Sequence, residues 1–388
     1  MKKTIVIIVI IILIVLGAAG GWIYLNKPNS SSKTTPATNN PVPIELSYVD
    51  KSLAGMSLSQ KVAGLLILHE LGTNATTLQK YLKKYQLGGL IFMGDNIPPT
   101  LGQLSSLTEK LQIDPQLPYL FAIDEEGGVV ARLATDNFPA PADLKSEPVT
   151  ATEIAFRSRS VMLKNVGMNL NFGIVADVTS DPNSFIYQRV FGGDPTAVSE
   201  RVAAAVTGAN GLTLSTLKHF PGHGETEADS HTSIPTTDVS FARWQQHDEP
   251  SFVAGIKAGA QVVMFGQLTY SKVDSLPATL STKWHDILKQ DGFTGISITD
   301  DMIMLQQSGN PKYTDPIANS VAALKAGNTM LLFVLSHDST VSDINPSTLI
   351  NGIVTAVKKG KLSQAIIDSD IRQVLTLRYS LPTTLTKN

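Results

Sequence analysis

The chain has 388 residues, of which 43% are hydrophobic and 16% are charged, so it can bury a substantial core. Its formal net charge is −2, from 31 basic and 33 acidic residues without a long run of either sign, which argues against a nucleic-acid-binding surface. It contains no cysteine, which excludes disulfides, Cys-ligated zinc, a thiol nucleophile and a lipid-modified N-terminal cysteine.

The first segment has the composition of a membrane-spanning helix. Lys2 and Lys3 precede an uncharged stretch over residues 4–25. A helix of that length covers about 33 Å, compared with about 30 Å for the hydrocarbon core of a bilayer. We predict a single-pass transmembrane anchor over residues 1–26, with the rest of the chain outside the cytoplasm because the lysines favour the inner side. A cleaved signal peptide, which would release a secreted protein, is the alternative, since residues 17–20 read GAAG.

A low-complexity segment follows over residues 27–43. It reads KPNSSSKTTPATNNPVP, in which only Ala37 and Val42 are apolar. Such a segment buries too little apolar surface to fold, so we predict a flexible linker. No second break of this kind follows, and we predict one globular domain over residues 44–388.

Short apolar runs alternate with longer amphipathic stretches through the globular region. The predicted strands are 89–92, 119–123, 169–175, 213–217, 261–265, 295–298 and 329–333. The predicted helices include 151–166, 196–209, 282–290 and 315–326. This alternation predicts an α/β fold with a parallel sheet, and seven or eight such units fit a (β/α)8 TIM-type barrel, regular or irregular. A doubly wound open sheet is the alternative, but the chain has neither a G-x-G-x-x-G nor a Walker sequence.

Polar residues stand where the predicted strands end. They are Asp124, Asp177, Lys218 with His219, Gln267 and Asp300. Barrel enzymes take their catalytic groups from the C-terminal ends of several strands, so we expect these side chains to converge at one mouth. One such residue alone could simply cap the next helix, but five positions in register favour a shared site.

The most unusual segment is KHFPGHGETEADSH over residues 218–231, which holds three of the seven histidines. His219 and His223 have the i, i+4 spacing of a zinc helix, but Pro221 and the neighbouring glycines disfavour a helix, so we predict no metal and no cofactor. Asp229 and His231 are two residues apart, so in a turn the carboxylate could accept a hydrogen bond from the imidazole and prepare it for proton transfer. An exposed polar loop with a local Asx turn is the alternative.

Further segments accompany this loop in a recognisable order. They include AIDEEGGVVARL (122–133), RVFGGDP (189–195), PATLS (277–281) and GFTGISITDDM (292–302). Together with KHFPGHG and DSH, they resemble the family 3 glycoside hydrolases, in particular the single-domain β-N-acetylglucosaminidases. The resemblance covers most of the globular region. It implies a retaining glycosidase that removes terminal β-linked N-acetylglucosamine from oligosaccharides, such as peptidoglycan fragments of the cell wall.

The resemblance also implies roles for individual residues. Asp300 matches the nucleophile that forms a covalent glycosyl-enzyme, and Asp301 is its competitor. His231 matches the acid/base, with Asp229 as its orienting partner, although most retaining glycosidases use a carboxylate there. If His231 only positions the substrate, Glu225 and Glu227 in the same loop are the first candidates for the acid. The residues implied to bind the substrate are Asp124, Arg189, Lys218 and His219.

The chain departs from the family pattern in two places, which leaves the fine substrate preference open. It reads MFGQ at 264–267, where relatives often have M-T-A-H, and GGVVARL at 127–133, where GGRV is commoner. The chain also ends before the second α/β domain of many family 3 β-glucosidases, which take their acid/base from elsewhere, so the DSH loop favours the N-acetylglucosaminidase branch. We also expect the protein to be a monomer. Two alternatives remain: a family 3 hydrolase or phosphorylase acting on another β-glycoside, and an inactive surface protein that binds glycans.

Overall fold

Parallel strands form the centre of the molecule. The structure is a computed structural model that describes residues 43–334 and 345–381, without the side chains of residues 43–47. Within these ranges the central strands are β1 (Leu66–Leu68), β2 (Gly89–Phe92), β3 (Leu120–Ile123), β4 (Leu170–Val175), β5 (Leu214–Phe220), β7 (Val262–Phe265), β9 (Ile296–Thr299) and β10 (Leu331–Phe333). They form an eight-stranded parallel sheet in the order β10-β1-β2-β3-β4-β5-β7-β9. A short parallel pair, β6 (Thr236–Thr237) with β8 (Thr269–Tyr270), lies outside this sheet.

The sheet closes into a nearly complete barrel at β9 and β10. A parallel bridge joins Ile298 to Met330. The hydroxyl of Thr299 accepts a 3.0 Å hydrogen bond from the backbone N–H of Leu332, and so takes the place of a backbone acceptor. The α/β barrel prediction is therefore confirmed, and the open doubly wound alternative is wrong because neighbouring strands follow one another in sequence around a closing sheet.

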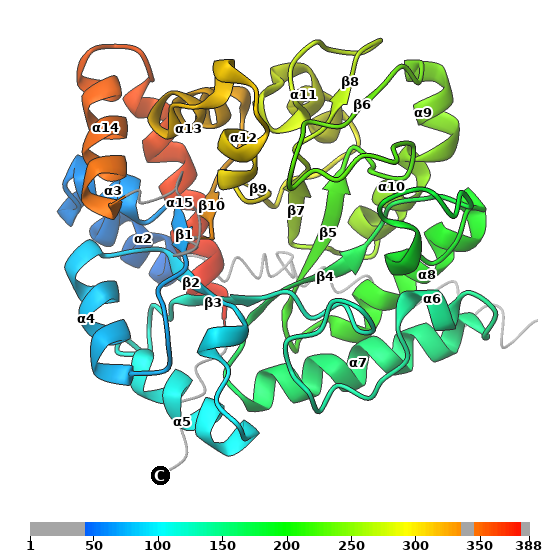
Figure 1. The fold of residues 1–388 in the computed structure, drawn as a ribbon. Helices are drawn as coiled ribbons and strands as arrows, with labels where there is room; N and C mark the ends of the chain where they lie inside the picture. The colour runs from blue at the N-terminus through cyan, green and yellow to red at the C-terminus, as the bar shows by residue number, and fades with distance from the viewer. Residues whose placement is uncertain (1–42, 335–344, 382–388) are drawn as a thin grey trace, which may run out of the picture. The chain divides into compact units, whose positions relative to one another are not determined.

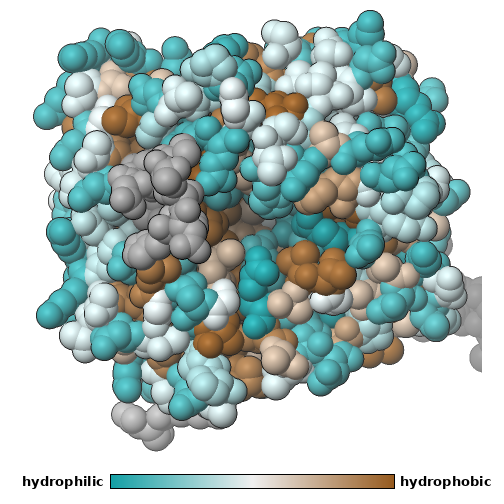
Figure 2. All heavy atoms as spheres, viewed as in Figure 1, coloured by the Kyte–Doolittle hydropathy of each residue, from teal (hydrophilic) through white to brown (hydrophobic). Residues whose placement is uncertain are grey.

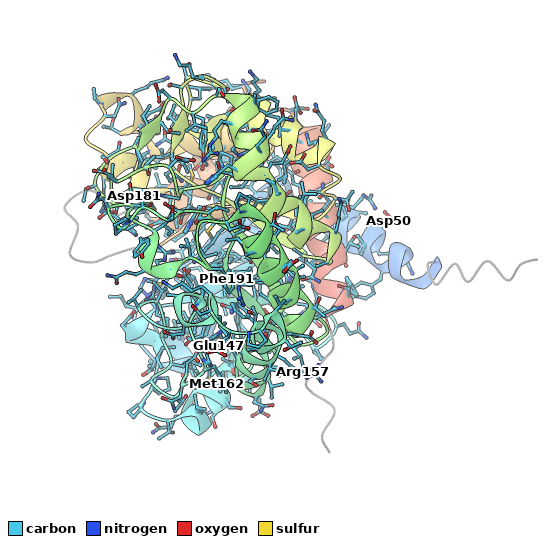
Figure 3. All side chains as sticks on the ribbon, turned by 90° about the vertical axis from the view of Figure 1, so that its right-hand side faces the viewer. Asp50, Glu147, Arg157, Met162, Asp181 and Phe191 are labelled. Carbon is cyan, nitrogen blue, oxygen red and sulfur yellow. The ribbon has the colours of Figure 1, made fainter. Side chains whose placement is uncertain are left out.

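Helices surround the strands, as Figure 1 shows. They are α2 (Pro43–Gly55), α3 (Leu58–Ala63), α4 (Ala75–Tyr85), α5 (Leu101–Leu111), α6 (Pro141–Leu144), α7 (Val149–Asn165), α8 (Pro195–Ala209), α9 (Phe241–His247), α10 (Glu249–Lys257), α11 (Thr282–Gln290), α12 (Ile303–Gln307), α13 (Pro316–Ala326), α14 (Pro346–Lys358) and α15 (Gln364–Ser380). Four short 3₁₀ segments are also described: η1 (Gly94–Asn96), η2 (Tyr187–Arg189), η3 (Ala278–Leu280) and η4 (Pro311–Tyr313). In the side view of Figure 3, Arg157 and Met162 mark the course of α7 along the outside of the strands.

The predicted elements agree closely with the observed ones. All seven predicted strands are present, with ends shifted by at most three residues, and the four predicted helices correspond to α7, α8, α11 and α13. Asp194 and Asp315 cap α8 and α13, and a proline follows each cap, a combination that starts helices well. Strand β1 was missed because its three apolar residues lie in one uninterrupted apolar run with the end of α3, from which only Gly64 and Leu65 separate them.

A cluster of aromatic side chains lies beside β5. The ring of Phe220 meets those of Trp244 and Trp284 edge to face, with centroids 6.1 and 5.9 Å apart. The indole N–H of Trp244 donates to the carbonyl of Pro221 at 2.7 Å, and the hydroxyl of Tyr270 donates to the carbonyl of Gly222 at 2.9 Å. These bonds fix the backbone where β5 passes into the histidine-rich loop.

No helix within residues 43–334 and 345–381 is both long enough and apolar enough to span a membrane. The predicted anchor, residues 1–26, lies outside the described residues. The predicted linker, residues 27–43, also lies outside them except for Pro43, which begins α2.

Candidate active site

A cavity of about 230 Å³ is lined by residues from the carboxyl ends of the strands. Those that end or follow β3, β5 and β9 are Asp124, Glu126, Lys218, His219, Asp300 and Asp301. Connecting segments add charged or aromatic side chains: Arg132, Phe185, Arg189, His223 and His231. Figure 2 shows a hollow near the centre of the face in view, where hydrophilic and hydrophobic surfaces meet. The cavity contains six of the seven predicted site residues; the seventh, Asp229, contacts His231 from outside the lining.

One wall of the cavity is a network of opposite charges. The ammonium of Lys218 lies 2.8 Å from Oδ1 of Asp124 and 2.6 Å from Oε1 of Glu126. Arg189 pairs with Glu126 through two hydrogen bonds of 2.6 and 2.9 Å, and Arg132 lies 3.5 Å from Asp124. Burial lowers the pKa of Lys218, but the two carboxylates outweigh it and raise that pKa. Burial likewise raises the pKa of Asp124, but Lys218 and Arg132 hold it below its usual range. The network therefore stays ionised at neutral pH and presents fixed charges to a polar ligand.

His219 is held as a neutral ring in one tautomer. Its Nδ1 lies 2.8 Å from Oδ2 of Asp177, and its Nε2 lies 3.3 Å from Nη2 of Arg189. A guanidinium can only donate, so Nε2 accepts and Nδ1 carries the proton, which it donates to Asp177. Burial and the Arg189 charge lower the pKa of His219 well below its usual value. His219 lies in β5 with both ring nitrogens hydrogen-bonded, so it does not form the zinc helix that its spacing from His223 suggested, and it lines the cavity as a polar, uncharged group.

Asp300 and Asp301 follow β9, and both line the cavity. Oδ1 of Asp300 accepts a 2.8 Å hydrogen bond from the backbone N–H of Asp301. Oδ1 of Asp301 accepts hydrogen bonds of 3.0 Å from the backbone N–H groups of Ile303 and Val334. Burial and the neighbouring Asp300 raise the pKa of Asp301 to about 7, although these amides oppose the rise.

Gln267 was expected at the mouth of the barrel, but it lies beneath it. Its side chain is fully buried, and its amide donates to the carbonyls of Asp300 and Asp301 at 3.3 and 3.4 Å. It is absent from the described lining of the cavity. Gln267 therefore supports the backbone that carries the two aspartates and does not face a ligand.

The Asp229–His231 pair stands in the loop after β5. Oδ1 of Asp229 accepts from Nδ1 of His231 at 2.7 Å and from its backbone N–H at 2.8 Å. Burial raises the pKa of Asp229, but these two bonds outweigh it and hold that pKa below its usual value. The His231 ring packs edge to face on Phe185, with centroids 5.8 Å apart, and its side chain is 62% exposed. The pairing directs the Nδ1 proton to Asp229, which leaves Nε2 available for proton exchange.

The alternative acids in this loop lie elsewhere. Within the described part of the chain the cavity lining includes neither Glu225 nor Glu227. Glu227 is exposed, and Oε1 of Glu225 lies 3.3 Å from Nδ1 of His247. His231 is therefore better placed than either glutamate to reach a ligand in the cavity.

Among the charged and aromatic residues of the cavity lining, the sequence did not single out Glu126, Arg132 and Phe185. Glu126 stands only two residues after Asp124, in the segment DEEGG, so its position just beyond β3 was a usable signal. Arg132 and Phe185 stand in irregular segments that the strand pattern does not place. Only the fold brings them to the strand ends.

The chain is similar to known glycoside hydrolases in sequence and in structure. The model of the glycosyl hydrolase family 3 N-terminal domain matches residues 57–377. Beta-hexosaminidase A of Pseudoalteromonas piscicida is 30% identical over 336 residues, 79% of this chain and 55% of that protein. A beta-hexosaminidase of Nitrosospira multiformis is 32% identical over 282 residues, 69% of this chain and 80% of that protein. A glycoside hydrolase family 3 beta-N-acetylglucosaminidase structure from a Paenibacillus species matches with a TM-score of 0.78 and 25% identity, covering 86% of this chain and 65% of that one. The chain thus spans about half the length of the first relative.

Proposed function

The chain belongs to glycosyl hydrolase family 3, and on this basis we propose that it hydrolyses terminal β-N-acetylglucosaminides with retention, through a covalent bond between the sugar and Asp300. One observation carries the proposal. A carboxylate, Asp300, and a histidine paired with a carboxylate, His231 with Asp229, face the same small cavity. Retaining glycosidases need such a nucleophile together with a group that gives and then takes a proton.

Asp300 is the better nucleophile of the two adjacent aspartates. Oδ2 of Asp300 makes no hydrogen bond to another described residue, so it can attack the anomeric carbon, while Oδ1 is oriented by the Asp301 amide. Oδ1 of Asp301 is held by two backbone N–H groups, and a pKa near 7 leaves part of this carboxyl protonated at neutral pH. A protonated, immobilised carboxyl is a poor nucleophile.

His231 supplies the proton and then removes one. As imidazolium, its Nε2 protonates the glycosidic oxygen while Asp300 attacks. The neutral ring then accepts a proton from the water that cleaves the glycosyl-Asp300 ester. The Asp229 carboxylate stabilises the positive charge during the first step and keeps the Nδ1 tautomer during the second.

The size and polarity of the cavity suit one terminal sugar. Its volume of about 230 Å³ is below the roughly 300–1,000 Å³ of pockets for drug-sized ligands. Asp124, Lys218 and Arg189 offer charged partners for hydroxyl groups, and His219 adds a neutral polar ring. Apolar side chains complete the lining, among them Ile91, Met93, Met264, Met304 and Leu332. These features support cleavage from the end of a glycan.

We further propose that the substrates are fragments of cell-wall peptidoglycan, met outside the cytoplasm. The support is the uncharged segment at residues 4–25 after Lys2 and Lys3, which would anchor the chain in the membrane.

A chromogenic aryl β-N-acetylglucosaminide tests the activity directly. The full-length chain should release the aryl group, and Asp300→Asn should not. Aryl β-glucosides should be cleaved more slowly, and added phosphate should leave the product as free sugar. Failure to exceed the Asp300→Asn background would support the inactive glycan-binding alternative, and a sugar phosphate as product would support the phosphorylase. Release of N-acetylglucosamine from purified muropeptides tests the natural substrate.

A further inference from the structure

Three side chains that can ligate a metal ion converge beside the histidine-rich loop. Nδ1 of His247 lies 3.3 Å from Oε1 of Glu225 and 3.4 Å from Oδ2 of Asp248. Glu225 belongs to the loop after β5, His247 ends α9, and Asp248 stands between α9 and α10. None of the three lines the cavity described above. The cluster is therefore distinct from the catalytic site, although it contacts the loop that carries His231.

The ligand atoms of this cluster lack hydrogen-bond partners. Asp248 is fully buried, yet neither of its carboxylate oxygens has a hydrogen-bond partner among the described residues. Oε1 of Glu225 and Nδ1 of His247 are also buried without one. Their separations of 3.3 and 3.4 Å exceed the usual hydrogen-bond range of about 2.7–3.2 Å. A buried carboxylate without a partner is unfavourable, so this arrangement is suited to accept a cation.

The spacing matches a tetrahedral ion. Zn²⁺ binds imidazole nitrogen at about 2.0–2.1 Å and carboxylate oxygen at about 2.0–2.2 Å, so two ligand atoms at the tetrahedral angle lie about 3.3–3.4 Å apart. The separations of Nδ1 of His247 from the two carboxylate oxygens agree with that value. All three ligand atoms lie within 4.8 Å of one another. We propose that Glu225, His247 and Asp248 form a Zn²⁺ site with its fourth position open to water.

The same residues offer a purely protein-based alternative. A protonated His247 could lie between the two carboxylates, with Nη2 of Arg243 adding positive charge 3.7 Å from Oε1 of Glu225. Arg243 is about half exposed, at 54%, so it can move away when an ion enters. The two arrangements differ in what they bind, because only the first takes up zinc with saturation and displaces the Nδ1 proton.

Zinc at this site would help to fix the position of the loop after β5 that carries His231. Trp244 and Tyr270 already hold the loop at Pro221 and Gly222. Zinc would hold the next part, because Glu225 would be joined to the α9–α10 junction. Glu225 precedes His231 by six residues, so the ion would position the loop without touching the substrate. This role is structural and does not depend on the proposed reaction.

Isothermal titration calorimetry of the full-length chain, stripped of metal with a chelator, tests the site with ZnCl₂. One equivalent should bind. Glu225→Gln should weaken the affinity by more than the roughly 10–100-fold lost when only an outer partner of a metal ligand is removed. His231→Ala is the matched control, because it removes a histidine from the same loop that is not one of the proposed ligands. This variant should keep the wild-type affinity for zinc.

Thermal melting gives a second readout that does not depend on activity. Zinc should raise the Tm of the wild type and of His231→Ala but not that of Glu225→Gln, because only a folded site binds the ion. Far-UV circular dichroism of the metal-free variants checks their folding, and Asp248→Asn replaces Glu225→Gln if the latter is unfolded. Absence of saturable binding to the wild type would overturn the proposal. So would binding that is lost in His231→Ala and kept in Glu225→Gln, since the ion would then sit at the Asp229–His231 pair.

Discussion

The backbone N–H of Asp301 donates a 2.8 Å hydrogen bond to Oδ1 of Asp300, so one aspartate orients the other. The carboxylate of Asp301 accepts hydrogen bonds from the backbone N–H groups of Ile303 and Val334. These bonds link the segment after β9 to the end of β10. Two neighbouring residues of one type thus have separate tasks. Asp300 is presented to the cavity, while Asp301 stabilises the seam of the barrel.

Replacing the two aspartates separately should show this division. Asp300→Asn should lower kcat by about 10³-fold or more, because the amide cannot form the glycosyl ester. Asp301→Asn should cost far less activity but should lower the Tm, since it disturbs the seam between β9 and β10. Steady-state kinetics and thermal melting measure both effects.

A fluorinated slow substrate provides a direct check of the same assignment. Peptide mass spectrometry of the trapped enzyme should find the sugar on Asp300. A label on Asp301 would reverse the roles of the two residues.

The hydrogen bonds from the aromatic cluster to the start of the histidine-rich loop should contribute to the stability of the protein. Tyr270→Phe removes the hydrogen bond to the carbonyl of Gly222 and leaves that buried acceptor unpaired, at a cost of about 1–3 kcal/mol. Denaturant unfolding should report the loss. Tyr48→Phe, on helix α2 far from this loop in sequence, is a matched control and should change stability by less than about 0.5 kcal/mol. Equal stability of Tyr270→Phe and wild type would mean that this bond does not hold the loop.

Much of the barrel could be predicted because its strands are short apolar runs between clear helical patterns. Strand β1 could not be predicted, because only the apolar residues Gly64 and Leu65 separate it from the apolar end of α3. The residues at strand ends were predictable as a group, since the carboxyl ends of parallel strands meet at one face. Their orientations were not. Gln267 follows the end of β7 as the other residues follow or end their strands, yet its side-chain amide donates to the backbone carbonyls of Asp300 and Asp301 beneath the mouth of the barrel.

Contacts between distant segments were the least accessible from the sequence. Glu126 was passed over although it pairs with both Lys218 and Arg189, which stand 92 and 63 residues further along the chain. The close approach of Glu225 to His247 likewise depends on how the loop after β5 folds back on α9. Local spacing, which revealed the Asp229–His231 pair, carries no information on such contacts.

Stability should fall as the pH rises from about 4 to 8, in part because of Asp370. Burial raises the pKa of this carboxyl to about 8, although the charge of Lys289 opposes the rise. The unfolded chain loses this proton near the ordinary pKa of 3.8, whereas the folded chain keeps it until about pH 8. The folded state therefore binds more protons in that window, and each such group lowers stability by up to about 1.4 kcal/mol per pH unit.

Asp370→Asn should flatten this dependence, since the amide does not titrate. Denaturant unfolding at pH 5 and pH 7.5 should show a smaller difference for the variant than for the wild type. Asp368→Asn is the control on the same helix, because that carboxylate is partly exposed and pairs with Lys61. An unchanged pH dependence in Asp370→Asn would show that Asp370 ionises normally in the folded chain.

The acid/base role of His231 predicts a dependence on the leaving group. His231→Ala should slow the cleavage of substrates with poor leaving groups by about 10²–10⁴-fold, the usual contribution of general acid–base catalysis. Activated aryl glycosides need little protonation, so their first step should be affected much less. Asp229→Asn keeps the shape of the side chain but replaces the carboxylate that accepts the Nδ1 proton, so it should lose much of the rate on the same poor substrates. Glu227→Gln, an exposed change in the same loop, should have little effect.

A plot of log kcat/KM against leaving-group pKa separates the outcomes, because it should be steeper for His231→Ala than for the wild type. Parallel plots would mean that His231 only positions the substrate, and a steeper plot for Glu227→Gln alone would move the acid to that glutamate.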